Sequence, residues 1–278
     1  MKINYHIHTS YSGDMIREGR LSETPEKYVE AAIQKGFSEI CFTDHVVVGR
    51  QKNDPLYGHA MDIERIPEYV REIKALAEKY ISIRIRIGIE LDWLPEASDE
   101  TKAFIKKFPF DCVLGSVHVF DGYKTENVVP EKIEVFWSGK SDEEIYARHV
   151  AYYRALQEMA KSGIFDVVAH LDAINRDGYV PKKSFWPLIE ETVDVIAKAK
   201  LCVEVNTKGL KKPIKKMHPS PEILALCKKK GIPVTIGTDA HWVNEIDLHY
   251  EKGINLIRSA GYDRLAVFEG RKMRFVKI

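Results

Sequence analysis

The sequence has no long hydrophobic run, no excess of charge of one sign and few cysteines, and each absence excludes a class of protein. Its longest apolar runs, such as residues 164–169, are far too short to span a bilayer. The formal net charge is +1, so no overall field attracts nucleic acid or an anionic membrane. Residues 1–5 form no apolar signal segment. We therefore expect a cytoplasmic protein that does not bind membranes.

The four cysteines, at positions 41, 112, 202 and 227, form no C-x-x-C pair. Three of them lie within apolar, strand-like runs, so we interpret all four as reduced core residues rather than catalytic thiols. The sequence also lacks a G-x-G-x-x-G or P-loop pattern, and nothing in it favours a nucleotide-cofactor site.

What the sequence does contain is a regular alternation of short apolar runs and amphipathic helical stretches. The runs are rich in Val, Ile and Cys, as is typical of strands covered on both faces. They span residues 2–6, 39–42, 83–89, 111–117, 165–169, 201–205 and 233–237. Helix starts lie between them, at Thr24-Pro25, at a capping box from Ser141 to Glu144, and at Ser220-Pro221.

This alternation predicts an α/β fold in one domain over residues 1–278, a seven-stranded (β/α)7 TIM-like barrel. A barrel is favoured over an open sheet because candidate ligands follow nearly every strand. Residues 265–268 and 273–278 predict an additional C-terminal β-hairpin. Two long irregular loops, at 46–63 and 120–139, either form the walls of a binding site or are surface loops without a function.

Histidines and carboxylates recur where these predicted strands end. Alternate residues of a strand point to the same side, so the first two histidines can hold one ion together. Each residue alone has an ordinary explanation, such as a hydrogen-bonded histidine or a solvated carboxylate. Their recurrence at one rim predicts a metal centre, because desolvated charged groups there need a cation or a dense hydrogen-bond network. The candidate ligands are His6, His8, Asp14, His45, Glu90, His118, His170, Asp239 and His241.

The predicted ligand set combines imidazole and carboxylate groups and contains no thiolate. This chemistry suits Zn²⁺, Mn²⁺ or Fe²⁺ better than an iron–sulfur cluster or an all-oxygen Ca²⁺ site. Nine ligands are too many for one ion, so we expect two or three divalent ions, with Glu90 placed to bridge them.

The motifs, taken in order, resemble those of the polymerase and histidinol phosphatase (PHP) superfamily. They are H-x-H at 6–8, T-D-H at 43–45, G-I-E-L at 88–91, G-S-V-H at 115–118, A-H-L-D at 169–172, E-V-N-T at 204–207 and G-T-D-A-H at 237–241. The combination is most similar to the histidinol-phosphatase branch. The resemblance implies a distorted seven-stranded barrel with a trinuclear metal centre at its rim.

The resemblance also implies how the ligands are divided among the ions. The first ion would be held by His6, His8, Glu90 and Asp239, the second by Glu90, His118 and His170, and the third by Asp14, His45 and His241. Many relatives have a histidine where Asp14 stands in this sequence, so the third site departs from the pattern of the family.

We predict a phosphomonoester hydrolase in which a metal-bridging hydroxide attacks phosphorus, with L-histidinol phosphate, an intermediate of histidine biosynthesis, as the substrate. Glu90 and Asp239 would serve the reaction as ligands, and Asp44 or His241 would move protons. The dianionic phosphate also needs cations outside the metal shell. The candidates are Arg176, Lys208 and Arg17.

Two alternatives remain open. One is a phosphoesterase of the same superfamily that acts on another small phosphate, a nucleotide or a DNA 3′ end. The near-neutral net charge and the lack of a basic module disfavour DNA. The other is a non-catalytic metal-binding protein with a relict site, which the nine competent ligand types disfavour.

Overall fold

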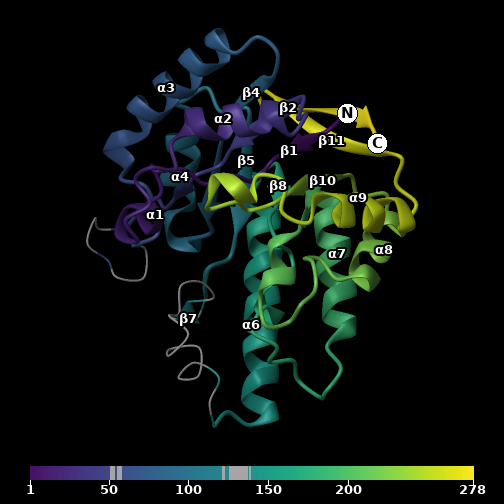
Figure 1. The fold of residues 1–278 in the computed structure, drawn as a ribbon. Coiled ribbons are helices and arrows are strands. Elements are labelled where there is room, and N and C mark those ends of the chain that lie inside the picture. The colour runs from purple at the N-terminus through teal and green to yellow at the C-terminus, as the bar shows by residue number, and fades with distance from the viewer. Residues whose placement is uncertain (51–53, 55–57, 121–122, 125–136, 138) are drawn as a thin grey trace.

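The structure is a computed structural model that describes residues 1–50, 54, 58–120, 123–124, 137 and 139–278 (Figure 1). Seven parallel strands form its centre, in the order β1-β2-β4-β5-β8-β9-β10, which is also their order along the chain. Their bounds are Ile3–Asn4 (β1), Glu39–Phe42 (β2), Arg84–Asp92 (β4), Cys112–Ser116 (β5), Val167–Val168 (β8), Cys202–Asn206 (β9) and Val234–Gly237 (β10). The seven predicted strands are confirmed.

The sheet closes on itself between its first and last strands. The Tyr5 amide donates to the Ile236 carbonyl at 2.9 Å, and the His8 amide donates to the Ala240 carbonyl at 2.9 Å. A parallel bridge between Ile7 and Ala240 lies between these two bonds. The predicted barrel is therefore confirmed, and the segment that carries His6 and His8 forms part of its closing seam.

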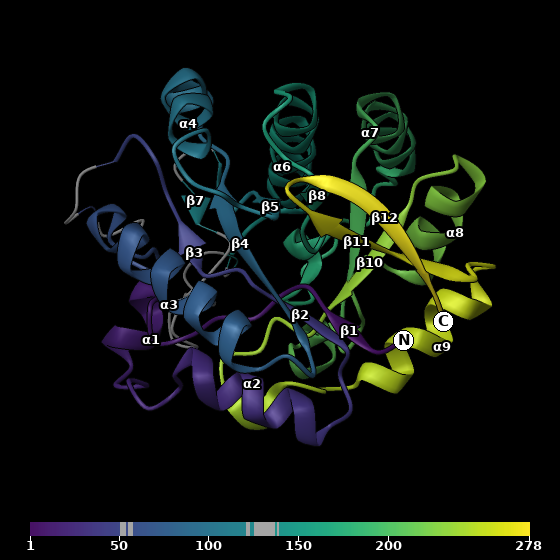
Figure 2. The ribbon, with the colours of Figure 1, turned by 90° about the horizontal axis from the view of Figure 1, so that it is seen from above.

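Helices surround the strands on the outside of this barrel (Figure 2). The predicted capping box is present at the start of α6, where Ser141 Oγ accepts from the Glu144 amide at 3.2 Å. Pro25 and Pro221 occupy the first turns of α2 and α8, as predicted. The helices are α1 (Gly13–Arg17), α2 (Pro25–Gln34), α3 (Ile66–Lys79), α4 (Ser98–Ile105), α6 (Asp142–Lys161), α7 (Trp186–Ala199), α8 (Pro221–Lys229) and α9 (Tyr250–Ser259).

Short 3₁₀ helices lie in several of the connections. They are η2 (Ile63–Arg65), η3 (Pro95–Ala97), η4 (Ala173–Asn175), η5 (Lys208–Lys211) and η6 (Val243–Glu245). Among the described residues, none of the helices has both the length and the apolar content needed to cross a bilayer.

The predicted C-terminal hairpin is present as β11 (Arg264–Glu269) and β12 (Lys272–Lys277). It ends beside the N-terminus, where the Met1 amino group donates to the Lys277 carbonyl at 3.2 Å (Figure 1). Arg271, in the turn of the hairpin, forms an ion pair with Asp166 at 2.9 Å just before β8. This pair is one of several contacts between the hairpin and the barrel, which also include an ion pair between Arg86 and Glu269.

Three two-residue strands were not predicted. β3 (His45–Val46) pairs with β4, whereas β6 (Val119–Phe120) and β7 (Tyr123–Lys124) pair with each other. They lie at the edges of the two long loops predicted as possible binding walls. Parts of both loops, residues 51–53, 55–57, 121–122, 125–136 and 138, lie outside the described residues.

Candidate metal centre

The nine predicted ligand side chains gather at the C-terminal end of the barrel. They come from the segment after β1, from α1, β3 and β4, and from the turns after β5, β8 and β10. Contacts of at most 3.5 Å between side-chain atoms connect all nine into one cluster. The convergence that the sequence predicts is therefore present in the structure.

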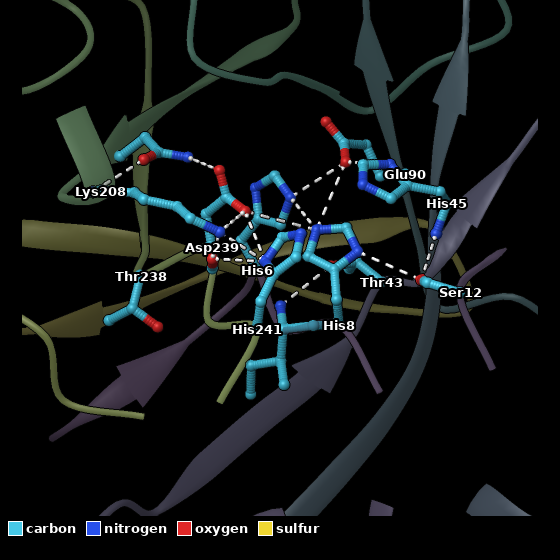
Figure 3. Close-up of polar contacts among 12 residues, drawn as sticks. His6, His8, Ser12, Thr43, His45, Glu90, Lys208, Thr238, Asp239 and His241 are labelled. Atoms are coloured by element: carbon cyan, nitrogen blue, oxygen red, sulfur yellow. Dashed lines mark hydrogen bonds and ion pairs between the residues drawn. The ribbon is translucent and has the colours of Figure 1, made fainter. Parts of the chain in front are cut away.

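Glu90 contacts five of the imidazoles in this cluster, and Figure 3 shows it beside His45. Its Oε2 atom lies 3.2 Å from His6 Nε2, 3.4 Å from His8 Nε2 and 2.9 Å from His45 Nδ1. Its Oε1 atom lies 2.8 Å from His170 Nε2 and 3.5 Å from His118 Nε2. One buried carboxylate is thus surrounded by five imidazoles, and its two oxygens face different histidines, as a bridging ligand requires.

Electrostatics hold Glu90 in its charged form. Burial alone raises the pKa of this carboxyl, but the positive potential of His6, His45 and His118 outweighs burial and holds the pKa well below its usual range. Burial, together with repulsion from His45 and His241, also lowers the pKa of His8 well below its usual value. For His6 the direction is opposite: burial lowers its pKa, but the negative charge of Glu204, Glu90 and Asp239 outweighs burial and raises the pKa well above its usual value, so a metal ion bound there must displace a proton.

The residues present fit a group of divalent cations. Within the described part of the chain, the buried Oε2 atom of Glu90 accepts no hydrogen bond despite its three imidazole neighbours. Ring nitrogens of His6 and His8 face each other at 2.9 Å. Among the described residues, four groups of three have ligand atoms within 4.8 Å of one another: His6/His8/Glu90, Glu90/His118/His170, His8/His45/His241 and His45/His59/His118. The donor set is imidazole and carboxylate, which suits Zn²⁺, Mn²⁺ or Fe²⁺.

Asp239 lies on the side of the cluster away from His45 in Figure 3, whereas the ring of His241 lies near that of His45, with the centroids 5.9 Å apart. Asp239 Oδ1 lies 3.5 Å from His8 Nε2, and His241 Nε2 lies 3.2 Å from a carboxylate oxygen of Asp14. Asp239 and His170 both have positive φ angles, of 52° and 25°. Such a backbone is uncommon for residues other than glycine and concentrates at functional sites, where surrounding structure holds it in place.

Two buried carboxylates orient the ligands, and neither was assigned a role from the sequence. Glu204 Oε1 contacts His6 Nδ1 at 2.7 Å, and Asp92 Oδ1 contacts His118 Nδ1 at 2.5 Å. A carboxylate that accepts from Nδ1 leaves Nε2 of the same ring as the metal-binding atom. Asp92 follows Glu90 by two residues on β4, so the alternation of the strand was a usable signal for it.

Asp44 is not part of the cluster of nine predicted ligands. Its buried carboxylate accepts hydrogen bonds from the Thr9 amide at 2.7 Å and from Ser12 Oγ at 2.7 Å. Burial raises its pKa. These contacts hold the loop that leads from His8 to Asp14. The proton-transfer role predicted for Asp44 stays a prediction.

A pocket of about 310 Å³ opens beside the cluster, and His170, Asp239 and His241 form part of its lining. Two of the three predicted phosphate-binding residues, Arg176 and Lys208, also line it. Lys208 Nζ donates to the Asp239 carbonyl at 2.6 Å and lies 3.2 Å from Asp239 Oδ1 (Figure 3).

The third predicted phosphate-binding residue, Arg17, is exposed and is not among the residues that line this pocket. Arg20, three residues later, lines it instead and stacks on Trp242 with its guanidinium carbon 4.4 Å from the ring centroid. The sequence predicted Arg17 for this role, whereas Arg20 is the residue of this segment that lines the pocket.

The four cysteines are free and buried, as predicted. His149 is buried and bonds the Ile145 carbonyl at 2.8 Å and Asn175 Oδ1 at 2.9 Å. His218 is buried, lies 2.7 Å from Asp172 and lines the pocket. His59 lies buried beside His45 and His118.

Comparison with known proteins adds independent information. The family model described as the PHP domain matches residues 4–208. A probable histidinol-phosphatase from Deinococcus radiodurans is 30% identical over 270 residues, which is 97% of each chain. A histidinol-phosphatase from Lactococcus lactis subsp. lactis is 30% identical over 98% of this chain and 96% of its own.

A solved structure is similar over the same extent. It is a histidinol phosphate phosphatase from Lactococcus lactis subsp. lactis in complex with zinc, L-histidinol and phosphate. It superposes with a TM-score of 0.78 at 27% identity and covers 98% of both chains.

Proposed function

The chain belongs to the PHP domain family and is a metal-dependent phosphoesterase of that family, and we propose that it hydrolyses L-histidinol phosphate to L-histidinol and phosphate. The observation that carries the proposal is the convergence of five imidazoles on buried Glu90 beside a pocket lined by Arg176 and Lys208.

When bound, the divalent ions lower the pKa of water and neutralise charge on a phosphoryl group. We assign their binding to the nine predicted ligands, in two or three sites that share Glu90. The chain itself then keeps these ligands in place, because Glu204 and Asp92 fix the orientation of His6 and His118.

The substrate phosphate would meet the cations that face the pocket. Lys208 already lies against Asp239 and His241, so its ammonium group is at the boundary between the ligand cluster and the pocket. Arg176 offers a planar fork of donors that matches the geometry of phosphate oxygens. We therefore assign phosphate binding to these two residues.

The choice of L-histidinol phosphate is supported by the relatives named above, which match nearly the whole of this chain. The volume of this pocket, about 310 Å³, is near the lower limit for small-molecule binding pockets and suits a small phosphate monoester. A nucleic-acid substrate finds less support, since the formal net charge is only +1.

A panel of phosphate monoesters, assayed with Mn²⁺, tests the proposal. The panel contains L-histidinol phosphate, a nucleoside 5′-monophosphate, a sugar phosphate and an oligonucleotide with a 3′-phosphate. We expect kcat/KM for L-histidinol phosphate to exceed each of the others by about 100-fold or more, equivalent to about 3 kcal/mol of transition-state discrimination. Similar rates across the panel would contradict this substrate and would leave a general phosphomonoesterase.

A further inference from the structure

His59 is a completely buried histidine that the family resemblance leaves without a role. Its ring packs edge-on against two predicted ligands, with centroid distances of 4.9 Å to His45 and 5.3 Å to His118. It is not among the residues that line the described pocket. A buried imidazole beside the metal cluster but outside the pocket has a position suited to holding ligands rather than to meeting substrate.

The side chain of His59 is connected to His118 through one carboxylate. His59 Nε2 donates to Asp92 Oδ2 at 3.0 Å, and His118 Nδ1 contacts Asp92 Oδ1 at 2.5 Å. Ser116 Oγ donates to the same Oδ1 atom at 3.1 Å. Asp92 is buried, so each of these donors compensates for the cost of removing its charge from water.

The backbone of His59 is connected to Asp14, a predicted ligand of the third ion. The His59 carbonyl accepts hydrogen bonds from the amides of Gly13 at 2.8 Å and Asp14 at 3.3 Å. Residues 58–60 pass so close to Gly13 that a β-carbon there would lie 2.4 Å from the Ala60 carbonyl oxygen and 2.7 Å from that of Gly58. Only glycine allows this approach, which fixes the start of α1.

We propose that His59 is a positioning residue that joins Asp14 to His118 and so keeps the third metal site assembled. Its backbone holds the start of α1, and its ring, acting through Asp92, fixes that loop to β4 and to His118. The inference rests on the proposed metal-dependent function, because it needs Asp14 to serve as a ligand. Loss of the ring leaves Asp92 short of one donor and frees the loop that places Asp14 against His241.

Metal content is the direct test, since it needs no substrate. The variants are His59→Leu, which removes the donor, and His59→Gln, whose amide can still donate to Asp92. Each protein is loaded with Zn²⁺, freed of excess metal and analysed for zinc per chain and for affinity. We expect His59→Leu to bind its most weakly held zinc ion about 10–100-fold less tightly, which is the loss typical of removing a hydrogen-bond partner of a metal ligand. His59→Gln should recover most of the lost zinc affinity.

His149→Leu is the matched control. Like His59, His149 is buried. Its two ring nitrogens are bonded to Ile145 and Asn175, which lie outside the ligand cluster. It should retain the zinc content of the unaltered protein. Gly13→Ala is an independent variant, because it leaves His59 intact but forces residues 58–60 away from the start of α1. It should show the same loss of zinc affinity. If His59→Leu does not fold, Gly13→Ala alone decides.

Two results would overturn the inference. Unchanged zinc affinity in His59→Leu and Gly13→Ala would show that the connection is not needed. Equal losses in His59→Leu and His59→Gln would identify the imidazole itself as a ligand, with His45 and His118. Failure of the proposed function has a different signature, in which the unaltered protein binds its full complement of zinc and hydrolyses no phosphate monoester.

Discussion

Glu90 is the shared ligand in the proposed metal centre, because it is a buried carboxylate with both oxygens facing imidazoles. Two features of the sequence pointed to it, its place at the end of a strand and its recurrence with histidines at the ends of other strands. The carboxylates that orient the ligands were harder to predict. Glu204 meets His6 across 198 residues of sequence, and a contact over that separation leaves no local pattern.

Removal of charge from two ligands should abolish turnover without unfolding the protein. In the double variant Glu90→Gln, Asp239→Asn, each replacement keeps the shape of the side chain and removes the anion that balances the cations. We expect kcat to fall by about 10³-fold or more, a loss typical of removing key electrostatic groups from an active site. Circular dichroism and steady-state kinetics provide the measurement.

A matched control makes the same two chemical changes at exposed carboxylates, Glu251→Gln and Asp263→Asn. That variant should retain kcat. Persistent turnover in the Glu90, Asp239 variant would mean that the reaction does not depend on this cluster.

The buried cysteines predict how stability responds to alkaline pH. Burial raises the pKa of the Cys227 thiol to about 12, whereas in the unfolded chain a thiol ionises near pH 8.5. Above pH 8.5 the unfolded state therefore releases a proton that the folded state keeps, and the free energy of unfolding falls by up to about 1.4 kcal/mol per pH unit for this thiol. Urea unfolding at pH 8.0 and pH 9.5 measures the effect.

In the same experiment, Cys227→Ala should show a shallower decline than the unaltered protein, because one of the four raised thiols is absent. A thiol reagent at pH 8.0 should react with the cysteines only after denaturant is added. Rapid reaction with the folded protein would contradict their burial as thiols.

At the scale of elements, the seven central strands were predictable because each is a short run of apolar residues between helix signals. Their ends were less predictable. β1 and β8 each contain only two residues, and the turn after β8 adopts a positive φ at His170. The strands β3, β6 and β7 are too short for side-chain alternation to identify them.

One of the contacts between the hairpin β11–β12 and the barrel is an ion pair that can be tested. Arg271 donates through Nε and an η-nitrogen to both oxygens of Asp166, at 2.9 Å and 3.0 Å. Burial raises the pKa of Asp166, so removal of its partner leaves a poorly solvated carboxylate. Arg271→Ala should lower the free energy of unfolding by about 2–3 kcal/mol, measured by urea denaturation.

The neighbouring exposed residue provides the control, and Lys272→Ala should change the stability by less than about 0.5 kcal/mol. If Arg271→Ala is as stable as the unaltered protein, the ion pair does not fasten the hairpin.

For the whole molecule, the alternation of strands and helices favoured a barrel, but the hydrophobic periodicity alone could not predict that the barrel closes. The seam depends on backbone hydrogen bonds between Tyr5 and Ile236 and between His8 and Ala240, which are more than 200 residues apart. The spacing of the motifs, which resembles the PHP superfamily, supplied the missing information on the metal centre. The proposed preference for L-histidinol phosphate came from the motif combination, whereas no residue that would contact the histidinol part of the substrate could be named from the sequence.

Removal of metal should destabilise the whole barrel, because the ligands come from seven segments and the ions hold them together. Ions at 100 times their dissociation constant add about 2.7 kcal/mol to the free energy of unfolding. For a chain of this size that corresponds to a fall in Tm of roughly 5–10 °C on chelation. The measurement is thermal unfolding with and without EDTA, followed by readdition of Zn²⁺ or Mn²⁺. A Tm that does not change on chelation would contradict the account.

The most direct test of the central claim is anomalous diffraction from crystals grown with metal and soaked in phosphate. Data collected at the zinc, iron and manganese edges locate each ion and identify its element. The account predicts two or three anomalous peaks at the mouth of the barrel, in contact with Glu90 and its surrounding imidazoles, with phosphate between them and Lys208. Metal-replete crystals that show no peak beside Glu90, or peaks only at other surfaces, would contradict it.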